Sequence, residues 1–127
     1  MKKIELISEN TNYTAVNVGS MDKLKDYSFM HPKNGQEITG KVFVNKATRS
    51  PGTEISFTTL PPQTDLSYFH FHTKDEETYI IIQVSGYSQV DDECFPICDG
   101  RVIRFDPNGV RGLCHTSDEP LVSLFVQ

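Results

Sequence analysis

The sequence has no long apolar run, no stretch rich in basic residues, and only three cysteines among its 127 residues. A membrane-spanning helix needs about 20 consecutive apolar residues, so none is expected. The opening decapeptide MKKIELISEN has no apolar stretch behind its lysines, which argues against a secretory signal peptide. Three cysteines are too few for a small disulfide scaffold. We therefore expect reduced thiols, including Cys94 and Cys98 as buried free thiols, and a cytoplasmic location.

The sequence also lacks an excess of positive charge. Twelve Lys and Arg stand against seventeen Asp and Glu, which gives a net charge of −5. A protein that binds nucleic acid without sequence preference needs clustered cations to neutralise phosphates. The composition therefore predicts no nucleic-acid partner and no membrane partner. No phosphate-binding glycine loop and no serine nucleophile elbow is present either.

Short runs of β-branched and aromatic residues make up most of the chain, with turn-forming clusters such as DPNG at 106–109 between them. The runs are 40–45, 53–60, 66–72, 77–84, 87–91, 94–97, 101–105 and 121–127. Many short strands at this spacing predict an all-β sandwich or barrel of antiparallel strands. The one helical pattern is at 20–27, where Ser20 could cap a short helix that buries Leu24 and Tyr27. We expect a single domain over 1–127.

Alternation within two of these strands indicates which side chains share a face. In the strand predicted at 66–72, one face carries Leu66, Tyr68, His70 and His72. In the strand predicted at 77–83, one face carries Glu77, Tyr79, Ile81 and Gln83. The opposite faces carry Phe69, Phe71, Ile80 and Ile82. Because both faces are apolar, the outer one must be covered by the first 35 residues or by a second subunit. We therefore expect a homodimer.

The string HFHTKDEETY at 70–79 indicates a metal site. Two imidazoles at positions i and i+2 of one strand lie about 6–7 Å apart on the same side, so both can approach one ion. A turn then brings a carboxylate back at the start of the next strand. Two histidine nitrogens and one carboxylate oxygen leave the rest of the coordination sphere open, as a catalytic site requires.

From residue 36 onward the sequence resembles a small single-domain cupin of the cupin 2 type, in the RmlC-like jelly-roll superfamily. His70, Phe71, His72, four intervening residues and Glu77 match the core of the first cupin motif. Thr64 and Val84 stand at its flanking glycine positions. The resemblance implies a jelly-roll β-barrel over 36–127, with residues 1–35 as a covering segment. It also implies one divalent metal ion (Zn, Fe, Mn or Ni) near the barrel axis, held by His70, His72 and Glu77.

The second cupin motif is represented by Gly100, Pro107 and Gly109. The histidine of that motif falls at Arg111 or Gly112, and neither residue ligates a metal. Arg111 either points into the barrel, where it could bind a carboxylate or phosphate, or lies at a surface turn. His115 is an alternative fourth ligand.

Further site residues are suggested by position. Glu76 is an alternative to Glu77 as the carboxylate ligand. We favour Glu77 because Glu77 shares a face with Tyr79. Tyr68 and Tyr79 are candidate substrate-binding residues, although such tyrosines often serve packing alone.

Three interpretations follow. The first is a metal-dependent enzyme, such as an oxygenase or isomerase, that acts on a small anionic or polyol-type molecule. The second is a non-catalytic small-molecule binding or sensor module whose metal site is degraded or absent. The third is a barrel in which the histidines satisfy one another and the tyrosines, which would leave polar groups to be paired at about 1–3 kcal/mol for each one unsatisfied.

Overall fold

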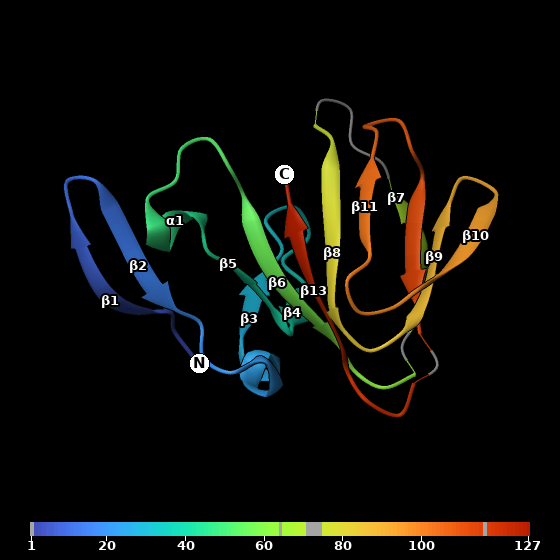
Figure 1. The fold of residues 1–127 in the computed structure, drawn as a ribbon, viewed down its shortest axis with the longest axis horizontal. Coiled ribbons are helices and arrows are strands. Elements are labelled where there is room, and N and C mark those ends of the chain that lie inside the picture. The colour runs from blue at the N-terminus through green and yellow to red at the C-terminus, as the bar shows by residue number, and fades with distance from the viewer. Residues whose placement is uncertain (1, 64, 71–74, 116) are drawn as a thin grey trace. The chain divides into compact units, whose positions relative to one another are not determined.

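The computed structural model describes residues 2–63, 65–70, 75–115 and 117–127, with the backbone alone of 65–70. Strands account for most of the regular structure in these residues, which confirms the predicted all-β class (Figure 1). The chain forms two compact units, Met1–Thr59 and Leu60–Gln127. Among the described residues no helix is long and apolar enough to cross a membrane. The single domain over 1–127, with residues 1–35 as a cover, stays a prediction.

The first unit consists of short paired strands. Its elements are β1 (Glu5–Asn10), β2 (Tyr13–Asn17), the 3₁₀ helix η1 (Met21–Asp26), β3 (Ser28–Met30), β4 (Glu37–Thr39), β5 (Lys41–Phe43), α1 (Asn45–Thr48) and β6 (Ile55–Leu60), whose last residue falls in the second unit. The pairs β1–β2, β3–β4 and β5–β6 are all antiparallel. Sequence patterns did not predict β1 to β4 or the short helix α1.

The helix predicted at 20–27 is present as η1, and Leu24 and Tyr27 are buried as expected. Ser20 precedes the helix, but its side chain makes no capping hydrogen bond to the backbone. The hydroxyl is hydrogen-bonded to the carboxylate of Asp22 instead, which lowers the pKa of Asp22 below its ordinary value. The position of the helix was therefore predicted correctly, whereas its capping interaction was not.

The second unit carries the candidate site. Its strands are β7 (Asp65–His70), β8 (Glu77–Gln83), β9 (Gly86–Val90), β10 (Glu93–Ile97), β11 (Val102–Phe105), β12 (Arg111–Cys114) and β13 (Leu121–Val126). All but β12 were predicted. The sequence of β12, RGLC, carries no β-branched or aromatic residue, and it is extended because it pairs with β9 on one side and β7 on the other.

Two antiparallel sheets make up this unit, one with the order β11-β8-β13 and the other with the order β10-β9-β12-β7. Their shared core consists of Leu60, Ile81, Ile97, Leu113 and Leu121. Because β8 and β13 belong to one sheet and β10 and β12 to the other, this cluster shows that the two sheets face each other.

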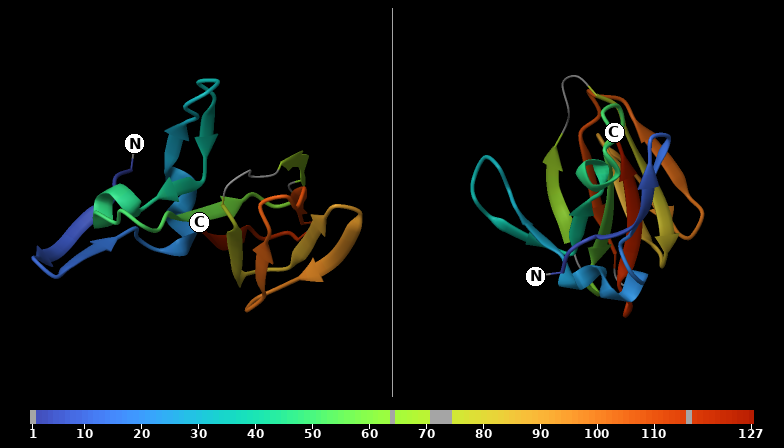
Figure 2. Two further views of the ribbon diagram at one scale, coloured as in Figure 1. Left: turned by 90° about the horizontal axis from the view of Figure 1, so that it is seen from above. Right: turned by 90° about the vertical axis from the view of Figure 1, so that its left-hand side faces the viewer.

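Strand β10 is an edge strand, and it forms a hairpin with β9 (Figure 2). This position explains two features of its sequence. Pro96 is tolerated because an edge strand has a side on which no backbone donor is needed. Cys94 is exposed, so the expectation that its thiol is buried was wrong. The described cysteines are all free, as predicted.

Burial along β8 alternates as the sequence predicted. Glu77, Tyr79 and Ile81 are buried, whereas Thr78 and Ile80 are half-buried and Ile82 is exposed. Val102 of β11, whose partner in the ladder is Ile80, is also exposed. This outer face is apolar, as expected, but Phe69 and Phe71 lie outside the described side chains. The homodimer through this face stays a prediction.

Val84, which stands at a glycine position of the first cupin motif, follows β8 with a φ of +73°. The left-handed region costs a residue with a Cβ atom about 1–2 kcal/mol, and β-branched residues rarely adopt it. The residue type therefore conflicts with the backbone at this turn.

We expect Val84→Gly to stabilise the protein by about 1 kcal/mol, because relief of the strain outweighs the greater flexibility of glycine in the unfolded chain. The matched control is Val102→Gly, in strand β11 and 63% exposed, which should lose about 0.5–1 kcal/mol. Denaturant unfolding of the two variants measures both effects. A loss of stability in Val84→Gly similar to that of Val102→Gly would contradict the expectation.

Candidate functional site

Glu77 is the first residue of β8, and its side chain lies on the inner face with only 5% of the residue exposed. Its Oε2 atom accepts a hydrogen bond of 2.9 Å from Nε2 of Gln127. Its Oε1 atom lies 3.7 Å from Nη1 of Arg111. The interior of the second unit therefore holds a carboxylate that is both hydrogen-bonded and paired with a cation.

Arg111 is fully buried on β12, so of the two orientations considered for it, the inward one is correct. Nη2 donates a 2.8 Å hydrogen bond to the carbonyl oxygen of Asp106. The guanidinium carbon also lies 4.8 Å from the ring centroid of Phe105, within the range of a cation–π interaction. These two contacts hold the guanidinium in place beside Glu77.

Two nitrogens of this guanidinium, Nε and Nη1, have no hydrogen-bond partner in the described part of the chain. Buried polar atoms are nearly always hydrogen-bonded, and each one left unpaired costs about 1–3 kcal/mol. The ion pair with Glu77 balances the charge of Arg111 but is too long to serve as a hydrogen bond. Arg111 therefore retains donor capacity for a further group.

The backbone of His70 lies beside that of Arg111. His70 is the last residue of β7, and its partner in the antiparallel ladder is Arg111. The side chain of Arg111 in turn reaches Glu77, which belongs to the facing sheet. The side chains of His70 and Tyr68, and the whole of His72, lie outside the described residues. In the part of the chain that is described with side chains, no three His, Cys, Asp or Glu residues gather as a metal site.

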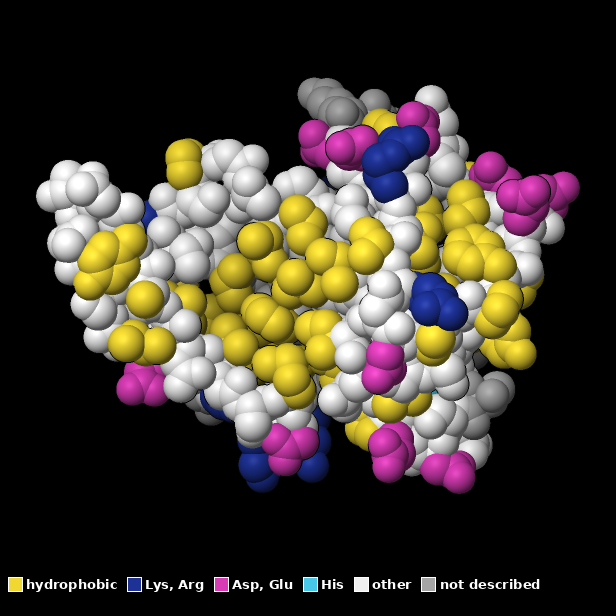
Figure 3. Space-filling model, in the orientation of Figure 1, with side chains coloured by type: hydrophobic (Ala, Val, Ile, Leu, Met, Phe, Trp, Pro, Cys, Tyr) yellow, Lys and Arg dark blue, Asp and Glu magenta, His cyan; other side chains and the backbone are white. Residues whose placement is uncertain are grey.

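Glu76 and Glu77 differ in solvent exposure, as the alternation of side chains along β8 predicts. Glu76 is exposed and forms a 3.2 Å ion pair with Arg104, in which both side chains are at least 60% exposed. Figure 3 shows acidic and basic side chains side by side at this end of β8 and β11. Since Glu77 is buried and Glu76 is not, the geometry favours Glu77 as the inward carboxylate.

Tyr79 packs between aromatic rings. Its ring is stacked on that of Phe125, with centroids 3.9 Å apart, and meets the ring of Phe105 edge-on at 4.6 Å. Phe105 in turn lies under the guanidinium of Arg111. Tyr79 therefore supports the surface on which Arg111 rests. Its role in binding a substrate stays a prediction.

His115, the alternative fourth ligand, is held away from Glu77. It is buried, and its Nε2 atom lies 2.6 Å from the carbonyl oxygen of Pro61, so this nitrogen carries the proton and donates. Along the chain, His115 lies about 13 Å from Arg111 at the strand rise of 3.3 Å per residue. His115 lies next to Gly86, which follows the C-terminal end of β8, whereas Glu77 is at the N-terminal end of that strand. Gly112, the other position considered, pairs with Gln89 and has no side chain to offer.

The sequence reasoning missed the partners that fix the ion pair, which are Gln127, Phe105 and the carbonyl group of Asp106. Gln127 reaches Glu77 because the preceding residue, Val126, pairs with Thr78 in the β13–β8 ladder. No motif in the sequence indicates this register.

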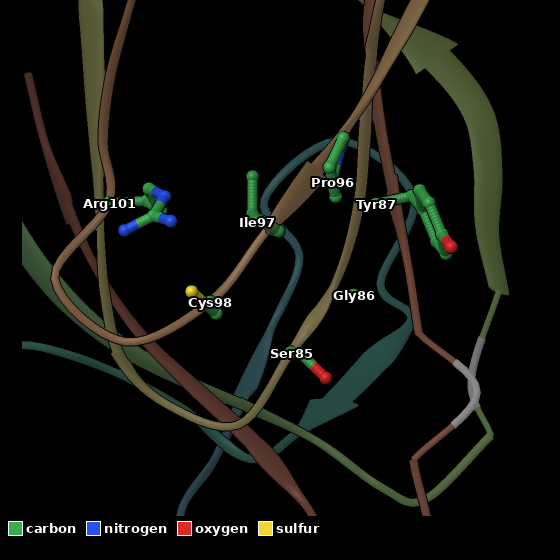
Figure 4. A pocket seen from close by; sticks show the side chains of 7 residues that line it. All are labelled: Ser85, Gly86, Tyr87, Pro96, Ile97, Cys98 and Arg101. Carbon is green, nitrogen blue, oxygen red and sulfur yellow. The ribbon is translucent and has the colours of Figure 1, made fainter.

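A pocket of about 260 Å³ lies beyond the opposite end of β8, lined by Ser85, Gly86, Tyr87, Pro96, Ile97, Cys98 and Arg101. Figure 4 shows that its polar groups do not converge, since the Ser85 hydroxyl points away from the Cys98 thiol. It contains neither Glu77 nor Arg111. This pocket is therefore not the candidate site.

Comparison with known proteins identifies the fold. No family model matches the sequence, and no curated protein does. Among solved structures, a cupin protein from Bacteroides fragilis is 28% identical, with a TM-score of 0.65 over 75% of this chain and 84% of that one. A cupin 2 conserved barrel protein from Salinispora arenicola has 16% identity and a TM-score of 0.64, over 88% and 87% of the two chains.

A third solved structure is described as a predicted oxalate decarboxylase from Thermotoga maritima. It is 19% identical, with a TM-score of 0.62 over 79% of this chain and 88% of that one. These similarities and the two facing antiparallel sheets show that the chain has the fold of a small cupin. The resemblance inferred from the HFH–E pattern is thereby confirmed at the level of the fold.

Proposed function

We propose that this protein binds one divalent metal ion (Zn, Fe, Mn or Ni) through His70, His72 and Glu77, and binds a small anionic or polyol-type molecule beside it. The observation that carries the proposal is the buried Glu77 carboxylate, which lies 3.7 Å from Arg111, whose ladder partner is His70. A homodimeric state and a cytoplasmic location belong to the same proposal.

The donor set fits such an ion. Two imidazole nitrogens and one carboxylate oxygen are ligands that Zn, Fe, Mn and Ni all accept, and the set leaves coordination positions open. The inner-face position of Glu77 supplies the one ligand whose side chain is described. When bound, the ion would polarise oxygen atoms of a ligand as a Lewis acid.

Arg111 supports the choice of an anionic molecule. Its two nitrogens without hydrogen-bond partners in the described residues are suited to the oxygens of a carboxylate or phosphate. The ring of Phe105 and the carbonyl of Asp106 restrict its movement, so little side-chain entropy is lost when an anion binds. In the catalytic form of this proposal, the bound molecule reacts as in a metal-dependent oxygenase or isomerase.

A second candidate is a non-catalytic small-molecule binding or sensor module without a metal. The Arg111–Glu77 pair favours it, because this pair neutralises its own charges with no ion present. In this alternative Arg111 binds the anion alone.

Elemental analysis of the untagged protein tests the proposal. After reconstitution with a divalent ion in the presence of succinate, we expect about one ion per chain in the wild type and in Glu76→Gln, whose carboxylate is exposed, and a near-complete loss in His70→Ala/His72→Ala. Absence of metal from the wild type under these conditions would reject the metal site. Thermal stabilisation by a carboxylic acid that persists in a chelator would then favour the second candidate.

A further inference from the structure

A simple metal centre would not have a buried arginine next to one of its ligands. Here the fully buried guanidinium of Arg111 lies beside the Glu77 carboxylate, which the proposed metal ion would also need. Nη1 of Arg111 lies 3.7 Å from Oε1 of Glu77, and the other oxygen of Glu77 accepts a hydrogen bond from Gln127. In the part of the chain that is described, Glu77 is the carboxylate within ion-pair distance of Arg111. A single negative charge thus serves both Arg111 and the ion.

The charge balance changes when an ion binds. Without it, Glu77 and Arg111 neutralise each other. With a divalent ion on neutral histidines and Glu77, the site holds two uncompensated positive charges. Like charges repel strongly in a buried site, where water screens them poorly. Arg111 cannot turn outward at low cost, because it is fully buried and bonded to the Asp106 carbonyl.

A doubly charged anion removes this penalty. It neutralises the two excess charges, and its oxygens can accept hydrogen bonds from Nε and Nη1 of Arg111, which have no such partner among the described residues. A polyol brings hydroxyl groups but no charge, so it satisfies the donors and leaves the repulsion in place. The charge balance therefore selects a dianion over a polyol.

We infer that metal and substrate bind interdependently, with Arg111 as the residue that couples them, and that the substrate is a small dianion with carboxylate or phosphate oxygens, for which succinate serves as the probe. This inference rests on the proposed metal site. By linkage, the anion tightens metal binding by the same factor as the metal tightens anion binding. Arg111 thus acts as a specificity-determining residue that keeps metal affinity low until an anion is present.

Calorimetric titration of the metal-free protein with Co²⁺, with and without succinate, tests the coupling at matched free Co²⁺ concentration. We expect succinate to raise the Co²⁺ affinity of the wild type at least about tenfold. Succinamide, a neutral analogue of similar shape, should leave the affinity unchanged. Arg111→Gln should bind Co²⁺ more tightly than the wild type without succinate and should gain less than about twofold from it.

Arg111→Lys is the second variant, because it retains the charge and should therefore retain the dependence on succinate even if Arg111→Gln folds poorly. Circular dichroism establishes that each variant is folded. Equal Co²⁺ affinity of the wild type with and without succinate would overturn the coupling while leaving the metal site intact. Full dependence on succinate in folded Arg111→Gln would also overturn it. A wild type that binds no Co²⁺ under any condition would reject the metal site and the coupling together.

Discussion

Glu77→Gln is expected to lose about 3–5 kcal/mol of folding stability, the largest effect of any single polar substitution that we anticipate. The change is nearly isosteric, and the new amide oxygen can still accept the hydrogen bond from Gln127. What it removes is the negative charge 3.7 Å from Arg111, a residue with no exposed surface. A buried guanidinium without a counter-charge is unfavourable because water cannot solvate it.

Denaturant unfolding measures this loss, and Glu76→Gln is the matched control. The exposed Glu76–Arg104 pair is screened by water, so its removal should cost no more than about 1 kcal/mol. The double variant Glu77→Gln/Arg111→Gln should be more stable than the sum of the single effects predicts, because the buried charges disappear together. Simple additivity in this cycle would show that the pair contributes no specific coupling.

Gly86→Ala is expected to destabilise the protein by about 3 kcal/mol. A Cβ atom at this position would lie 2.5 Å from the carbonyl oxygen of Cys114 and 2.7 Å from Cβ of His115. Neither neighbour can move aside cheaply. One is backbone, and the other belongs to a buried ring whose Nε2 lies 2.6 Å from the Pro61 carbonyl. Strand β9 cannot retreat either, since Gly86 pairs with Ile97 and Tyr87 with Cys114.

The control for Gly86→Ala is Gly52→Ala, at which an added Cβ meets nothing within 4 Å. Gly52→Ala should change stability by less than about 1 kcal/mol and could raise it, because alanine is less flexible than glycine in the unfolded chain. Thermal and denaturant unfolding of both variants give the comparison. If Gly86→Ala proved as stable as Gly52→Ala, this would contradict the close contact between Gly86 of β9 and the carbonyl oxygen of Cys114 in β12.

Alternation within a strand was the most informative sequence signal. It predicted which residues of β8 face inward, and the burial of Glu77, Tyr79 and Ile81 confirms this. It also separated Glu77 from Glu76, whose side chains differ in exposure as expected. The rule works here because successive side chains of any extended segment point to opposite faces, whatever that segment pairs with.

Pairing between strands was beyond the reach of the sequence. Strand β12 has no β-propensity pattern and is extended because β7 and β9 supply its hydrogen bonds. The contact between Gln127 and Glu77 depends on the β13–β8 register, which joins residues 50 positions apart. His115 was a reasonable ligand by its place in the sequence, yet its ring reaches the Pro61 carbonyl instead.

The sequence by itself therefore determined the all-β class, the cupin resemblance and the inward position of Glu77, because these depend on the local order of residue types. Only the tertiary structure decided what accompanies Glu77. It buried Arg111 beside the carboxylate, held it with Asp106 and Phe105, and placed His115 elsewhere. The physical reason is that a buried charge is tolerated only where strands distant in sequence supply its partners, and their register is fixed by the packing of the whole unit.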